Sequence, residues 1–241
     1  MNFKTVITAV SRLDVVIRKS LFELHSRFFT NLKLDSFLAD LAEKQWVILS
    51  RNQDRIVAFS TLIIHEETLG GKPVDFMFTG DTIVDPEFWQ DNILAPAIGR
   101  FIDHQLELKP NRPLYWFLIC KGYRTYLTLP RFFKSFIPNP EAVTDPLLQE
   151  LLDHICRLRY GDTYDPLRGI LDFGNTKDFL APELQEVPES RSSGKFIRYF
   201  LEKNPGWTRG DELVCLVDVS PGNQKPLFRR VADSLTGPVF E

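Results

Sequence analysis

Residues 80–102 decide the fold, and they read GDTIVDPEFWQDNILAPAIGRFI. The first of them complete a strand that begins at Val74, and Gly80 inside this strand indicates a β-bulge. An Asp-Pro turn ends the strand, and a helix is expected from Asn92 to Leu108. Residues 114–120, LYWFLIC, are almost all apolar, which is typical of a strand in the buried middle of a sheet.

The part of the chain before this stretch predicts two helices and then three strands. The first helix carries an apolar stripe at helical spacing, with charges on its other side: Leu13, Ile17, Leu21, Leu24 and Phe28. Asp35 can cap a second, shorter helix. Residues 46–50, 55–65 and 74–84 are rich in β-branched and aromatic residues and are separated by turn residues. They predict an antiparallel meander.

The C-terminal part of the chain is more irregular. Asp145-Pro146 is a strong helix start, because an Asp cap is followed by Pro at the first helical position. Residues 160–193, rich in Gly, Pro, Asp and Ser, predict an irregular insertion, and residues 212–219 predict a last strand. The tail that follows is expected to lie over the surface. We therefore expect a core of residues 1–140 and an extension, 141–241, that packs on the core and returns strand 212–219 to its sheet.

The composition is that of an ordinary globular protein. The 241 residues are 44% apolar and 25% charged, and the net charge of −3 disfavours nucleic acid as a partner. The three cysteines lie far apart without metal-ligand spacing, so we expect reduced thiols and no metal. The N-terminus does not resemble a signal peptide, and no run of 18 apolar residues predicts a transmembrane segment. These features favour a cytoplasmic protein.

The order of these elements, with residues 80–102 and the LYWFLIC strand, resembles the GNAT (Gcn5-related N-acetyltransferase) fold of the acyl-CoA N-acyltransferase superfamily. The resemblance covers roughly residues 10–135. It implies an α/β (α+β) protein with a mixed, mostly antiparallel central sheet flanked by helices, followed by a helical and irregular C-terminal extension. It also implies acyl-CoA as a co-substrate and an amine as the acceptor.

The family holds the pyrophosphate of coenzyme A in a turn with the pattern Gln/Arg-x-x-Gly-x-Gly/Ala, which aligns with Gln90 to Ala95 here. Ile93 stands at the first glycine, Asp91 adds a negative charge, and Pro96 removes a backbone donor. The motif is therefore degenerate. Unpaired N–H groups and the dipole at a helix N-terminus are the physical basis of such a site. The resemblance implies these cofactor-binding residues: Ile83, Val84, Gln90, Asp91, Asn92, Ile93, Leu94 and Ala95.

The resemblance also implies a base for the amine and an acid for the departing thiolate. Asp81, beside the expected bulge, is the candidate base; a carboxylate that only bonds the backbone at the strand end is the alternative. Tyr123 and Tyr126, after the LYWFLIC strand, are the candidate acids; buried tyrosines with satisfied hydroxyls are the alternative. Cys120, at the end of that strand, is expected to be a small buried core residue.

Two functions stay open. The first is an N-acyltransferase, in which a small-molecule amine acceptor directly attacks the thioester of a small-molecule acyl donor, either acyl-CoA or another acyl carrier. The second is a non-catalytic GNAT-fold module that binds or interacts without coenzyme A chemistry, which the substitutions in the turn favour. A homodimer is kept as one option for the assembly.

Overall fold

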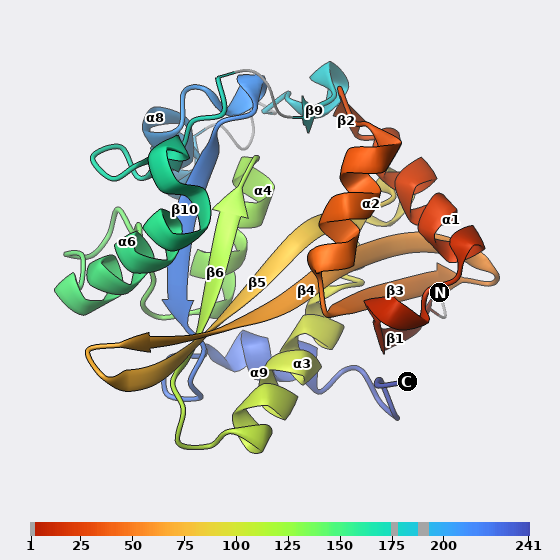
Figure 1. The fold of residues 1–241 in the computed structure, drawn as a ribbon, viewed down its shortest axis with the longest axis horizontal. Coiled ribbons are helices and arrows are strands. Elements are labelled where there is room, and N and C mark those ends of the chain that lie inside the picture. The colour runs from red at the N-terminus through yellow and green to blue at the C-terminus, as the bar shows by residue number, and fades with distance from the viewer. Residues whose placement is uncertain (1–2, 175–177, 188–192) are drawn as a thin grey trace. The chain divides into compact units, whose positions relative to one another are not determined.

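The computed structural model describes residues 3–174, 178–187 and 193–241 (Figure 1). They form two compact units. The first unit comprises residues 3–27, Leu32–Leu114 and Pro226–Glu241, and the second comprises Phe28–Asn31 and the described residues from Tyr115 to Lys225. The division into a core of residues 1–140 and an extension, 141–241, that packs on it stays a prediction.

Four antiparallel strands form the sheet of the first unit. In spatial order they are β1 (Phe3–Ala9), β3 (Trp46–Asn52), β4 (Arg55–Leu69) and β5 (Lys72–Val84). The predicted meander is confirmed in β3, β4 and β5, and both strands of the β4–β5 hairpin are longer than expected. Sequence analysis missed β1 (seven residues), because its residues do not alternate between apolar and polar. Four consecutive ones, Thr5 to Thr8, are all buried.

Two helices follow β1 and pack on the sheet. The first, α1 (Val15–Ser26), begins at Asp14, whose side chain accepts a hydrogen bond from the Ile17 N–H at 2.7 Å. The second, α2 (Leu34–Glu43), has Lys33 as its N-cap, so the prediction that Asp35 caps it is wrong. Asp35 lies inside the first turn, where a negative charge favours the helix dipole.

Opposite faces of this sheet carry different helices. Trp46 of β3 contacts Phe101 of α3 (Ala95–Leu108), with ring centroids 5.2 Å apart. Phe59 of β4 contacts His25 of α1 at 6.2 Å. Trp46 pairs with Leu62, and Phe59 lies three residues before Leu62 on the same strand, so the two aromatic residues face opposite sides. Figure 1 shows α1 and α2 on one side of these strands and α3 on the other.

The C-terminal residues belong to the first unit rather than lying loosely over the surface, so that prediction is wrong. They form a helix, α9 (Pro226–Ala232), that packs against α3 at Gly99. Beyond it, the Ile7 N–H donates to the Val239 carbonyl at 2.6 Å, and the Glu241 N–H donates to the Ile7 carbonyl at 3.0 Å. This bridge covers part of the free edge of β1.

The second unit has its own antiparallel strands. The predicted strands at 114–120 and 212–219 are β6 (Leu114–Cys120) and β10 (Glu212–Asp218), which pair with each other. Short strands β7 (Tyr164–Asp165), β8 (Ile170–Leu171), β2 (Phe29–Thr30) and β9 (Phe179–Leu180) add the pairs β10–β8, β7–β8 and β2–β9. Residues 160–193 are thus irregular with short strands, and 175–177 and 188–192 lie outside the described residues.

Among its described residues, the second unit also has the helices α4 (Tyr123–Tyr126), α5 (Thr128–Phe132), α6 (Pro146–Tyr160) and α8 (Lys195–Lys203). The predicted start of α6 is confirmed, since the Asp145 carboxylate accepts a hydrogen bond from the Leu147 N–H at 2.9 Å. No helix within the described ranges is long and apolar enough to cross a bilayer. The mixed α/β class and the mostly antiparallel pairing that the sequence predicted are confirmed.

Candidate functional site: the bulged strand β5 and the turn into α3

The end of β5 is fixed by a buried carboxylate. Asp85 caps a short 3-10 helix (Pro86–Phe88) by accepting a hydrogen bond from the Glu87 N–H at 3.3 Å. Its other oxygen lies 2.8 Å from Arg27 and 3.5 Å from Arg55. Because Asp85 is only 4% exposed, these two cations compensate its charge in a poorly solvated place. The strand end and the following turn are thereby held together.

The turn itself is closed by Trp89 and by a left-handed residue. The Trp89 indole N–H donates to the carbonyl of Val84 at 2.7 Å and so folds back on the strand end. Asn92 has a φ of +57°, a conformation that asparagine tolerates better than most residues. The resemblance placed the motif's first glycine at Ile93. The residue with a positive φ is instead Asn92, the preceding one. A β-branched side chain such as isoleucine would be strained at position 92.

The helix after the turn leaves several donors unpaired. It begins at Ala95, three residues later than predicted. Among the residues that the structure describes, the N–H groups of Ile93, Leu94, Ala95 and Ala97 donate no hydrogen bond. The side chains of Ile93 and Leu94 are 6% and 4% exposed, so both point into the protein. The Ile93 side chain thus packs in the protein interior and does not project from the turn.

The predicted bulge in β5 is confirmed. The pairing with β4 shifts between Ser60 and Leu62, so that Gly80 and Asp81 together lie opposite Thr61. A Cβ atom at Gly80 would collide with the Thr61 hydroxyl and lie 3.1 Å from Lys44 Cε. Glycine is thus required here because neighbouring side chains occupy the space that any other side chain would need.

Asp81, the candidate base, lies beside a buried histidine. Its carboxylate Oδ2 is 3.6 Å from Nδ1 of His25 on α1. The side chain of Asp81 is 22% exposed, whereas that of His25 is 2% exposed. Sequence analysis did not single out His25. His25 lies four residues after Leu21 on the same face of α1, and this spacing was the available signal, because that face is buried.

The remaining cofactor residues of the first unit have ordinary places. Ile83 is buried and pairs with Phe59, and Val84 pairs with Ala58. Asp91 is exposed, and its N–H donates to the Phe88 carbonyl at 3.0 Å. Gln90 is also exposed. The turn therefore presents one carboxylate to solvent next to the unpaired N–H groups.

The candidate acids Tyr123 and Tyr126 belong to the second unit, and both are buried. The Tyr126 hydroxyl donates to the Pro138 carbonyl at 2.9 Å, and burial raises its pKa far above the usual value. Within the described part of the chain, the Tyr123 hydroxyl has no hydrogen-bond partner. Cys120 is buried, as predicted, and its sulfur lies 3.8 Å from that of Cys215.

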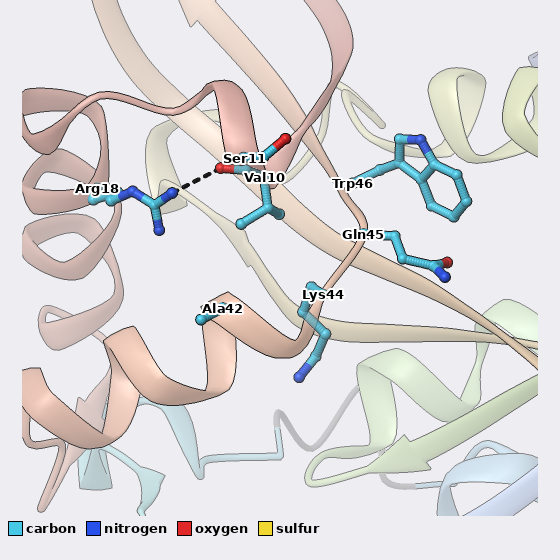
Figure 2. A pocket seen from close by; sticks show the side chains of 7 residues that line it. All are labelled: Val10, Ser11, Arg18, Ala42, Lys44, Gln45 and Trp46. Atoms are coloured by element: carbon cyan, nitrogen blue, oxygen red, sulfur yellow. Dashed lines mark hydrogen bonds between the residues drawn. The ribbon is translucent and has the colours of Figure 1, made fainter.

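A pocket of about 430 Å³ also opens on the first unit, but none of the predicted site residues lines it. Its lining residues are Val10, Ser11, Arg18, Ala42, Lys44, Gln45 and Trp46 (Figure 2). Both cations there are already engaged: Arg18 donates to the Val10 carbonyl at 2.8 Å, and Lys44 donates to the Asp40 carboxylate at 2.7 Å. Neither is left to recognise an anion.

No protein-family model matches the chain, and neither does any curated protein sequence. The similar solved structures include a probable N-acyltransferase from Enterococcus faecalis V583 (TM-score 0.42, 11% identity, 55% of this chain and 33% of that one). They also include a GCN5-related N-acetyltransferase from Kribbella flavida, with a TM-score of 0.41 and 13% identity over 56% of this chain and 34% of that one. A third is the glucosamine-6-phosphate N-acetyltransferase of Arabidopsis thaliana, with a TM-score of 0.40 and 15% identity over 60% of this chain and 97% of that one.

The chain spans about a third of the length of the first two of these structures. The elements of the chain follow the order that the sequence predicted: two helices, a bulged antiparallel meander, and a turn into α3 followed by an apolar strand. The chain has a GNAT-like fold.

Proposed function

We propose that this protein is an acyl-CoA-dependent N-acyltransferase. The observation that carries the proposal is the turn into α3, where four unpaired N–H groups follow a bulged strand that bears a partly exposed carboxylate. Backbone donors at a helix N-terminus suit the pyrophosphate of coenzyme A. The side chains of Ile93 and Leu94 point into the protein and so lie away from these donors.

The same turn also predicts that coenzyme A binds weakly. Asp91 places a negative charge beside an anion, and Pro96 supplies no donor. A charge next to a helix terminus is worth about 0.3–1 kcal/mol, which is roughly two- to fivefold in affinity. Neutralising Asp91 should therefore tighten binding measurably.

The chemistry follows from the residues in their proposed roles. Asp81 would take a proton from the amine acceptor, whose nitrogen then forms a bond to the thioester carbonyl carbon while the carbon–sulfur bond breaks. The leaving thiolate must also gain a proton. Of the two candidate acids, Tyr123 has a hydroxyl without a hydrogen-bond partner in the described residues, whereas the Tyr126 hydroxyl donates to the Pro138 carbonyl. The cytoplasmic location and the homodimer stay predictions.

A second function, a non-catalytic binding module, is favoured by Trp89. Its indole closes the turn by bonding to the strand end at Val84, and Pro96 removes one donor from the helix start. If these features block the turn, the protein keeps the fold without coenzyme A chemistry. The two functions differ in whether coenzyme A binds at all.

Thermal unfolding with acetyl-coenzyme A, a long-chain acyl-coenzyme A and pantetheine tests the proposal. A ligand at a hundred times its Kd stabilises the native state by about 2.7 kcal/mol, which for a chain of this length raises Tm by roughly 5–10 °C. Pantetheine lacks the pyrophosphate and should give a much smaller shift. Asp91→Asn should enlarge the shift with acetyl-coenzyme A.

The matched control is Asp54→Asn, which removes the same charge from the exposed turn between β3 and β4. It should leave the ligand-induced shift unchanged. If neither the natural protein nor Asp91→Asn responds to any coenzyme A ester at millimolar concentration, the acyltransferase proposal is wrong and the binding module stands.

A further inference from the structure

The most informative pair of side chains in the first unit is His25 and Asp81. His25 Nδ1 and Asp81 Oδ2 are 3.6 Å apart, just beyond hydrogen-bond length. Polar contacts at active sites are often this long without substrate and shorten when it binds. A small rotation of the carboxylate would bring the two atoms into a hydrogen bond.

The ring of His25 is held in place by aromatic neighbours. Phe37 of α2 and Phe59 of β4 lie edge-to-face with it, at 5.6 Å and 6.2 Å between ring centroids and interplanar angles of 68° and 73°. Such packing restricts how far the imidazole can turn. Because His25 is buried among rings, its Nδ1 atom keeps a fixed direction toward Asp81.

The bulge explains why Asp81 faces this histidine. Thr79 pairs with Leu62, which shares its face of the sheet with Trp46 and therefore faces α3. Ile83 pairs with Phe59, which faces α1. Residues 79 and 83 would share a face in a regular strand, so the extra residue between them reverses the alternation. Asp81, two residues before Ile83, therefore lies on the face that α1 covers.

We propose that His25 is the positioning residue for Asp81: its Nδ1–H donates to the carboxylate and fixes the orientation of that group. The partly exposed Asp81 can then accept a proton, while the buried imidazole behind it does not touch the substrate. The catalytic part of this role rests on the proposed acyl transfer. The pairing itself does not, so the two can fail separately.

Nitrogen-detected NMR of the histidine side chains tests the pairing. In the natural protein near neutral pH, Nδ1 of His25 should carry a proton. Asp81→Asn should lower the titration midpoint of His25 by about one pH unit or more, a tenfold loss of proton affinity, because a nearby carboxylate favours the protonated ring. His104, which packs against Phe240 with centroids 4.4 Å apart, is the internal control and should not respond.

Two substitutions at His25 test the catalytic consequence. Asn places an amide donor near the position of Nδ1, whereas Leu keeps only apolar volume. With acetyl-coenzyme A and a panel of primary amines, His25→Leu should lower kcat about ten- to hundredfold at an unchanged KM for the thioester. His25→Asn should retain most of kcat. The Tm of each variant shows whether it remains folded.

Each outcome decides a different point. A proton on Nε2 instead of Nδ1, or a His25 signal that ignores Asp81→Asn, overturns the pairing. Equal kcat in His25→Leu and the natural protein overturns the positioning role. If the natural protein releases no thiol from acetyl-coenzyme A with any amine, the proposed acyl transfer fails, and the NMR result alone still decides the pairing.

Discussion

The contact between α3 and α9 gives the sharpest prediction about stability. A Cβ atom at Gly99 would lie 2.6 Å from the Cβ of Ala232 and 3.2 Å from its Cα. These distances are well below ordinary contact, so Gly99→Ala forces the helices apart. Overpacking of this kind costs about 1–3 kcal/mol, and the higher helix propensity of alanine returns about 1 kcal/mol. The expected net loss is about 0–2 kcal/mol.

A double-mutant cycle separates the two contributions. Ala232→Gly alone should cost about 1 kcal/mol in propensity. In the double variant the 2.6 Å collision is gone and only the 3.2 Å approach to the Cα of residue 232 remains, so Gly99→Ala should cost less than it does in the natural protein. The coupling free energy between the two positions should therefore be about 1–3 kcal/mol in favour of the double variant. Urea unfolding of the four proteins measures it, and additive effects would refute the close packing of α3 on α9.

Three further substitutions have expected outcomes. Asp75→Asn removes the charge of a buried carboxylate that pairs with Arg112 and Lys109. It should lower the urea-measured free energy of unfolding by about 1–3 kcal/mol, because both cations are partly exposed and keep Glu66 as a partner. Asp145→Ala removes the cap of α6 and should cost about 1 kcal/mol by the same assay. Burial raises the pKa of Tyr126, whose ordinary value is 10.0, so the unfolded chain loses the phenolic proton first. The contribution of Tyr126 to the free energy of unfolding should be fully present below pH 10.0 and should decline above it. Tyr126→Phe should flatten this decline, as thermal melts across alkaline pH would show.

The strands and helices with strong local signals were predictable from the sequence. The meander has turn residues between β-rich segments, and the start of α6 has Asp followed by Pro. By contrast, β1 is a seven-residue strand without alternation. Helix α9 was missed because its short segment is stabilised by packing on Gly99 rather than by its own propensity. Tertiary contacts decided both elements, and no local pattern reports such contacts.

The candidate site was predictable only in part, for a related reason. Gly80 revealed the bulge, and the Asp-Pro turn and α3 placed the unpaired donors. The partner of Asp81 could not be found, because strict alternation would have put Asp81 on the same face as Thr79. Only the register with β4 shows that the bulge turns Asp81 toward α1 and His25.

The altered turn shows how a chain can keep a positive φ and unpaired N–H groups at a helix start without a glycine. Glycine supplies two things, a positive φ and the absence of a side chain near the ligand. Here Asn92 takes the positive φ, which frees position 93 from that requirement. Ile93 then buries its side chain in the protein, so its N–H remains without an acceptor at the start of α3. Asn92→Gly should therefore preserve the fold of the turn, whereas Asn92→Val should strain it and lower Tm, because a β-branched residue disfavours this conformation.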